Sequence, residues 1–183
     1  MTVEPMGQLD PLADEIDTPI VVQGARGTVE RPDLIDALAR ASGEHAADLQ
    51  AFAPETVYGA AHLEAAARRA LRAHEQDRAI ARDLAVEVAC YAAGTDQIDD
   101  ALAAVGVPAE ARAVAICSLG QAAEPALEQA LAELGLERDD SVVQREEQAL
   151  ATIGISEPMR EHVPEDEWGD LAIEQVALLD AER

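Results

Sequence analysis

Apolar residues follow two spacings along the chain. Three stretches rich in β-branched or apolar residues predict strands, at 18–29, around Phe52 and at 111–119. Helical spacing of apolar residues predicts helices in most of the rest, at 31–42, 61–76, 80–93, 97–105, 124–135 and 168–180. This order of elements predicts an α+β fold, with a small central sheet of about three to four strands flanked by helices in a single domain.

The predicted helices differ in how their apolar residues are distributed. Helix 61–76 has an apolar face that includes His74 and an opposite face that bears arginines. Helix 80–93 is apolar almost all round, which predicts that it is the most buried helix and that Gly94 ends it as a left-handed cap. The last helix repeats apolar residues on one face, and we expect that face to bind another apolar surface.

The ends of the chain set the expected domain limits. Residues 1–17 are polar and acidic and contain proline, so we expect a flexible acidic arm there. Residues 18–183 are then expected to form one domain, because 183 residues suffice for a single core without metal or disulfide staples.

The chain carries a large excess of acidic residues, which gives information about its environment. The chain has 37 acids against 13 cations, all of them arginines, for a net charge of −24. Hydrophobic residues make up 49% of the chain, so disorder is a poor explanation of the acid excess. The acids are mostly interspersed rather than in runs, which favours adaptation to a salty cytoplasm over an acidic DNA mimic or cation buffer. We therefore expect a halophilic protein whose melting temperature rises with KCl.

The sequence contains no recognisable catalytic or cofactor motif. Nucleotide-binding glycine loops, nucleophile elbows, zinc-binding HExxH and paired CxxC spacings are all missing from it. Cys90 and Cys117 lie in apolar surroundings and are interpreted as buried thiols. The four histidines share no ligand spacing, and Glu87 is more readily explained by a hydrogen bond than by acid–base catalysis. We expect no enzyme activity, no cofactor and no metal.

No run of 18 apolar residues predicts a membrane-spanning helix, and acids stand where a signal peptide would carry cations. The sequence therefore predicts a soluble, cytoplasmic protein with no membrane partner.

One window reverses the overall charge. Residues 68–82 contain five arginines and only two acids. They could simply pair with acids on helix surfaces, as exposed arginines often do. Alternatively they form a phosphate site, because Arg78 and Arg82 flank the predicted start of helix 80–93, where backbone N–H groups favour an anion. At high salt such a site must act through close contacts, which favours a defined RNA end or loop over a generic duplex.

The middle of the chain resembles a known family. The runs VYGAAHLEAAARRAL and IARDLAVEVACYAAGTDQIDDAL, and above all the Gly-x-x-Gln-Ile step that starts at Gly94, resemble the small non-catalytic subunit of the KEOPS complex, known in animals as the PRPK-binding protein, TPRKB. The resemblance implies a partner kinase subunit and capture of the single-stranded 3′ CCA end of tRNA, in support of threonylcarbamoyladenosine modification. Because this chain lacks lysine, any contact that the family makes with lysine is made here by arginine or not at all.

The resemblance also implies candidate site residues. The expected tRNA contacts are Arg68, Arg72, Arg78, Ile80, Arg82, Gly94, Thr95 and Gln97. The expected kinase contacts are Leu171, Val176 and Leu179, on an apolar face of the last helix that should be exposed in the isolated subunit. Two alternatives stay open, a halophilic protein-interaction module without an RNA role and a small-molecule enzyme without a recognisable motif. An enzyme should gather perturbed titratable groups in one pocket.

Overall fold

A four-stranded antiparallel sheet organises the chain, for which a computed structural model describes residues 17–182. The strands are β1 (Ile20–Glu30), β2 (Asp48–Phe52), β3 (Glu110–Leu119) and β4 (Glu137–Arg138). Their order in the sheet is β2-β3-β1-β4, so β2 forms one edge. The predicted acidic arm lies outside the described residues, apart from Asp17.

Eight α-helices connect and cover the strands within the described range. They are α1 (Arg31–His45), α2 (Gly59–Glu75), α3 (Leu84–Ala93), α4 (Ile98–Val105), α5 (Ala123–Leu134), α6 (Glu147–Thr152), α7 (Glu157–Arg160) and α8 (Trp168–Ala181). Short 3-10 turns occupy Pro54–Thr56, Asp140–Val143 and Glu165–Glu167.

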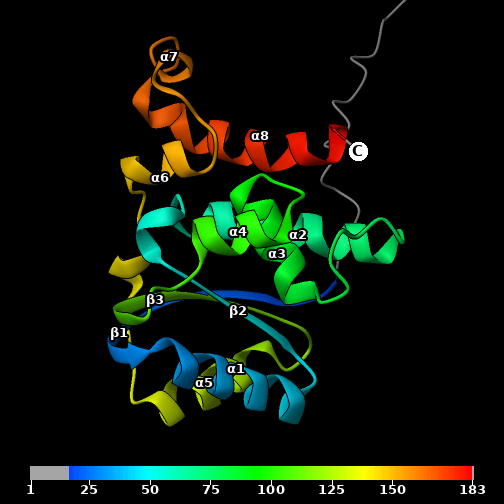
Figure 1. Cartoon of the computed structure of the whole chain (residues 1–183), viewed down its shortest axis with the longest axis vertical. Helices are drawn as coiled ribbons and strands as arrows, with labels where there is room; N and C mark the ends of the chain where they lie inside the picture. The colour runs from blue at the N-terminus through cyan, green and yellow to red at the C-terminus, as the bar shows by residue number, and fades with distance from the viewer. Residues whose placement is uncertain (1–16, 183) are drawn as a thin grey trace, which may run out of the picture.

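Both faces of the sheet are buried, because helices cover each side (Figure 1). Along β3, Ala115, Cys117 and Leu119 belong to the core under α2, α3 and α4. The alternate residues Val114 and Ile116 belong to the core under α1 and α5. This period-two alternation between two buried faces explains why β3 reads in the sequence as a continuous apolar run.

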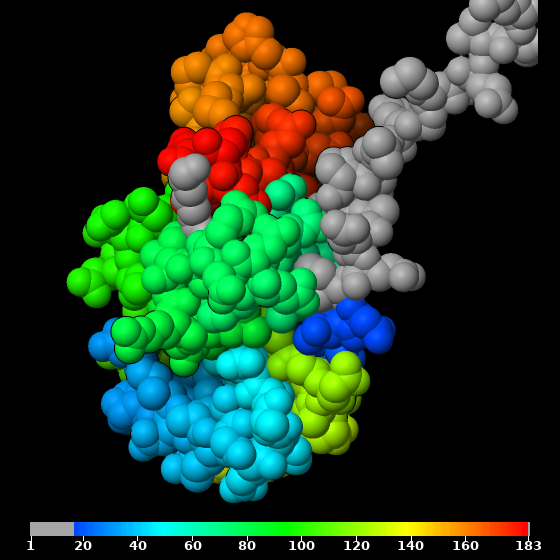
Figure 2. All heavy atoms as spheres, turned by 90° about the vertical axis from the view of Figure 1, so that its right-hand side faces the viewer, coloured from blue at the N-terminus to red at the C-terminus, as the bar shows by residue number. Residues whose placement is uncertain are grey.

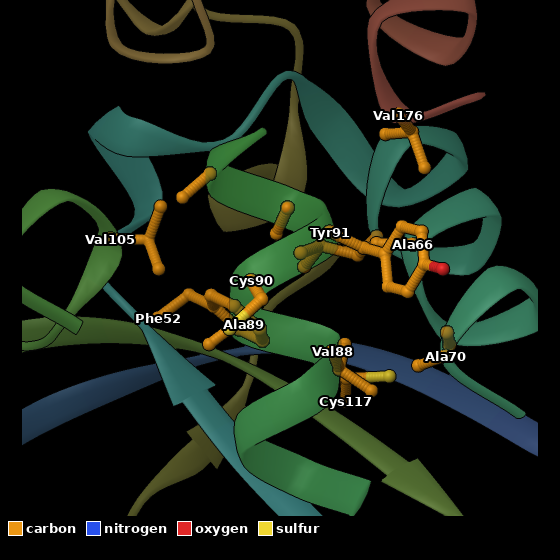
Figure 3. Packing of buried hydrophobic residues seen from close by; sticks show 14 of the residues in the cluster. Phe52, Ala66, Ala70, Val88, Ala89, Cys90, Tyr91, Val105, Cys117 and Val176 are labelled. Carbon is orange, nitrogen blue, oxygen red and sulfur yellow. The ribbon is translucent and has the colours of Figure 1, made fainter. Parts of the chain in front are cut away.

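A further layer lies on the helices above the sheet. Helix α8 runs over α2 and α3 (Figure 1), and its buried Val176 and Leu179 join the same core as Tyr91 of α3. Figure 3 shows Tyr91 directed towards Ala66 of α2, with Val176 nearby. A smaller cluster around Leu150 and Ile153 joins α6 to the start of α8.

The predicted α+β fold is confirmed, with four strands and helices on the sheet. Helix α3 is the most buried of the three central helices, since eight of its ten residues are buried. Cys90 and Cys117 are both buried, as predicted. The predicted helix 80–93 begins at residue 84 instead, because Asp83 turns extended and its side chain accepts a hydrogen bond from the Val86 N–H.

Candidate functional site

The arginine window covers the end of α2 and the loop to α3. Figure 2 shows this part of the chain, around residues 70–83, as exposed surface between α8 in red and the turn from α1 to β2 in cyan. The five arginines of the window have different surroundings, and we call the set Arg68, Arg72, Arg78 and Arg82 the arginine surface.

Arg69 is absent from this set because it serves the fold. Its guanidinium forms a 2.8 Å ion pair with Asp180 of α8. The second carboxylate oxygen of Asp180 accepts a hydrogen bond from the Tyr91 hydroxyl. One carboxylate thereby ties together α2, α3 and α8, which is the structural role that arginines on helix surfaces commonly have.

The other arginines remain accessible. The Arg68 side chain is exposed on the outer side of α2, and that of Arg82 is exposed just before α3. Neither forms an ion pair with a described residue. Arg72 is half-buried, and Arg78 is exposed and donates from Nε to the Gln76 side-chain oxygen at 3.1 Å. Arg68 and Arg82 therefore keep guanidinium donors for a ligand.

The start of α3 is not the open anion site that the sequence suggested. The Asp83 carboxylate caps the helix by accepting from the Val86 N–H at 3.2 Å. The buried Glu87 carboxylate accepts from the Ala81 N–H at 2.7 Å. These two carboxylates already bind N–H groups at the helix start, so a phosphate there would meet negative charge. Arg82 can still bind a phosphate, but without help from the α3 dipole.

A hollow beside the loop gathers part of the candidate site. It has a volume of about 280 Å³ and is lined by His74, Asp77, Ala79, Ile80, Ala81 and Arg82. It thus combines the apolar Ile80 with the guanidinium of Arg82. His74 Nε2 is buried and has no hydrogen-bond partner among the described residues. Sequence reasoning missed this histidine as a site residue, because its place on the apolar face of the helix indicated a core residue.

The predicted contacts at Gly94, Thr95 and Gln97 lie elsewhere. They form the turn at the other end of α3, and ten residues of helix separate the two groups by about 15 Å. Gly94 adopts a left-handed conformation (φ 70°) under Gln175 of α8, and Thr95 Oγ1 accepts from the Gln97 N–H at 3.2 Å. The structure does not bring this turn together with the arginine surface, so RNA contact there stays a separate prediction.

The expectation of an exposed apolar face on the last helix is wrong. Val176 is 1% and Leu179 is 3% exposed, because both pack against α2 and α3, and Leu171 is half-buried. Helical spacing reveals an apolar face but does not tell whether a partner or the chain itself covers it. Among the three residues predicted for the kinase contact, only Leu171 has accessible surface. The exposed large apolar residue of α8 is Leu178, at 48%.

Burial explains the two large pKa shifts, those of His62 and Cys117. Burial lowers the pKa of His62 to about 4 and raises the pKa of the Cys117 thiol to about 12. His62 Nδ1 accepts from the Tyr58 N–H at 3.1 Å at the start of α2, whereas Cys117 lies on β3. No group of three or more His, Cys, Asp or Glu side chains within residues 17–182 could hold a metal ion. In the same range, no helix is both long and apolar enough to cross a membrane.

Comparison with known proteins identifies the family. A search of curated proteins found no match. The sequence model of the family described as kinase binding protein CGI-121 matches residues 29–157. The match runs from the end of β1 to the first residue of α7 and includes α2, α3 and their connecting loop, with α8 outside it. Because the match covers well over half of the chain, this protein belongs to the CGI-121 family of kinase binding proteins.

Proposed function

We propose that this protein is a non-catalytic subunit of the KEOPS complex that binds the kinase subunit and captures the 3′ CCA end of tRNA, in support of threonylcarbamoyladenosine modification. Membership of a kinase binding family supports the kinase part. The arginine surface supports the tRNA part. The observation that carries it is the hollow at which Ile80 and Arg82 meet, on a protein with a net charge of −24.

Single-stranded RNA fits this arrangement better than a duplex. A hollow of about 280 Å³ that has both apolar and cationic lining suits an unstacked base next to a phosphate. Arg68 and Arg72 lie one turn apart on α2, on the way to the loop, and can contact preceding phosphates. Aromatic residues are 2% of the chain, so the site relies on guanidinium and aliphatic contacts rather than ring stacking.

The tRNA proposal is tested by binding measurements at high KCl. Intact tRNA should bind far more tightly than tRNA without its terminal CCA, whereas loss of the anticodon arm should matter little. Arg82→Glu should weaken binding of intact tRNA, because it removes a charged hydrogen bond and adds repulsion. Arg112→Glu is the matched control, since Arg112 is also exposed and lies on β3, away from the hollow.

We infer that kinase binding uses a different surface of α8 from the one that the sequence suggested, because Val176 and Leu179 are buried. The outer side of the helix carries Leu178, 48% exposed, among the exposed acids Asp170, Glu174 and Glu182. We place the kinase contact there, as an apolar anchor with an acidic rim that suits a basic partner surface. Leu178→Asp should abolish co-purification of the kinase subunit without lowering the melting temperature.

The two tests also separate the alternatives. Kinase binding that persists while intact and CCA-less tRNA bind equally would indicate an interaction module without an RNA role. Failure of both tests would remove the KEOPS assignment and leave the enzyme alternative open.

A further inference from the structure

A groove follows the free edge of β2, and Asp83 at one end of it directly follows Arg82, which lines the hollow. β2 is the outermost strand of the sheet on this side and runs between the α1 layer and the layer of α3 and α4 (Figure 1). Residues of all four elements line the groove, which has a volume of about 390 Å³. A sheet edge normally pairs with another strand or is blocked by charge, proline or a covering element.

The backbone of β2 presents hydrogen-bonding groups to this groove. Ala53, just after the strand, donates its N–H to the Val105 carbonyl at 2.9 Å, away from β3. Alternate residues of an antiparallel strand direct both backbone groups to the same side. Leu49 and Ala51 therefore direct theirs into the groove. The Ala51 carbonyl accepts from the Gln50 side chain at 3.0 Å, which leaves the Leu49 N–H, the Leu49 carbonyl and the Ala51 N–H for a ligand.

The walls of the groove are apolar and accessible. Ile35 of α1 is 57% exposed on one wall, and Leu102 of α4 is 38% exposed on the other. They are two of four large hydrophobic residues that are exposed in the described part of the chain. Apolar walls on both sides of a strand edge match the side chains of an added strand, which point alternately to the two faces of a sheet.

Charges of opposite sign mark the two ends. Asp48 and Asp83 line the groove where β2 begins, and the exposed Arg31 lines it near Val107, beyond the end of the strand. Burial, and then the charge of Asp83, raise the pKa of Asp48 and outweigh the lowering effect of His74, so a cation placed between the two carboxylates would relieve an unfavourable arrangement. A ligand with a cation at one end and a carboxylate at the other would complement both ends.

We propose that the groove binds an extended peptide segment of a protein partner, which adds to β2 as a fifth strand of the sheet. Apolar side chains of the segment contact Ile35 and Leu102. A cationic side chain lies between Asp48 and Asp83, and an acidic one lies near Arg31. Antiparallel addition is favoured because antiparallel pairing is slightly more stable per residue. The acid of the segment then precedes its cation in sequence.

A second copy of the chain fits less well than a peptide. The β2 edge lies between helices, so a second β2 would bring its own α1 and α4 against the same walls. Its own Asp48 and Asp83 would also add negative charge to an acidic end, on a protein that already carries −24. A single strand without flanking helices avoids both problems.

The probe is the peptide acetyl-Gly-Glu-Val-Leu-Val-Arg-Gly-amide, titrated into the full-length ¹⁵N-labelled protein in KCl buffer; its valines face the wall of Ile35 and its leucine faces the wall of Leu102. In the antiparallel register its two valines lie opposite Ala51 and Leu49. We expect shifts of the Leu49 and Ala51 amide resonances and slower hydrogen exchange at both. The same peptide with N-methylation at its second valine should bind about tenfold more weakly, because it lacks the donor to the Leu49 carbonyl. Asp48→Asn in the protein should weaken binding of the unmodified peptide about threefold.

Four outcomes would overturn the proposal. The first is equal binding of the N-methylated peptide, and the second is shifts that avoid Leu49 and Ala51. The third is a short RNA that ends in CCA and shifts the same two amides, because the groove would then belong to the RNA site. The fourth is concentration-dependent dimerisation that Leu102→Asp abolishes, which would make a second copy the occupant. The first two outcomes leave the tRNA and kinase proposals untouched.

Discussion

Arg68 and Arg69 are neighbours on α2 but belong to different parts of the molecule. Arg69 lies on the side of α2 that α8 covers, and its 2.8 Å ion pair with Asp180 helps to hold that cover in place. Arg68 lies on the outer side, exposed and without an ion pair among the described residues. A step of one residue turns about 100° around a helix, enough to separate a residue that serves the fold from one that can serve a ligand.

The covered side of α2 shows that charged and apolar residues in the sequence do not by themselves reveal which surface binds partners. The arginine window and the last helix both looked functional in the sequence. Arg69 of α2, together with Val176 and Leu179 of α8, joins α8 to the rest of the protein. Only side chains that remain accessible after these contacts, such as Arg68, Arg82 and Leu178, can act on partners in the folded chain.

The largest effect should come from a charge on the covered side. Leu179→Asp places a carboxylate among buried apolar side chains, at a position that is 3% exposed. We expect it to lower the free energy of unfolding by about 4 kcal/mol or to prevent folding. Leu178→Asp, one residue earlier on the exposed side, is the control and should change stability little. Similar melting curves for both variants would mean that α8 does not cover α2 in solution.

A second effect concerns His62, which α3 buries against the start of α2. Its pKa is about 4 in the folded chain, below its ordinary value of 6.5, so below pH 6.5 the unfolded state binds a proton that the folded state does not. Stability should therefore fall as pH falls from 6.5 to about 4, by about 3 kcal/mol from this residue. His62→Gln should remove this part of the pH dependence, whereas the exposed His162→Gln should keep it. Equal slopes for the His62 variant and the wild type would contradict burial of His62.

A smaller effect is expected at the carboxylate that joins the helices. Asp180→Asn weakens both the ion pair with Arg69 and the hydrogen bond from Tyr91, so it should cost about 1 to 2 kcal/mol, because the pair is partly screened by solvent. Arg68→Met should cost almost nothing. In a double-mutant cycle, Arg69→Met should couple to Asp180→Asn and Arg68→Met should not. Coupling of Arg68 instead would reverse the assignment of the two neighbours.

The fold was largely predictable from the sequence, because its main signals are local. β-Branched residues predicted β1, a continuous apolar run predicted β3, and helical spacing predicted α1 to α5 and α8. The all-apolar pattern of α3 predicted its burial correctly. Short elements such as β4 and α7 were missed, since two to four residues carry too little periodicity to be distinguished from a loop.

The candidate site was only partly predictable, because it depends on contacts between distant segments. The sequence located the arginine window but could not tell that Asp180, about 110 residues later, takes Arg69. It also placed the start of α3 four residues too early. Asp83 and Glu87 accept hydrogen bonds from the N–H groups that the sequence analysis had assigned to an anion. Gly94 and Gln97 are near the arginine window in the sequence but lie at the far end of α3. A helix keeps its two ends apart, so nearness in the sequence did not place these residues in one site.

The central claim is that the accessible residues of the arginine surface contact the 3′ end of tRNA. A two-by-two comparison tests it most directly, with wild type and Arg82→Glu each titrated with intact tRNA and with tRNA that lacks CCA, in the same high-KCl buffer. We predict that Arg82→Glu weakens binding of intact tRNA at least tenfold, on the order of 1.5 kcal/mol or more, and has almost no effect on tRNA without CCA. An equal loss for both tRNAs would show that Arg82 acts on another part of the tRNA and would contradict the proposed site.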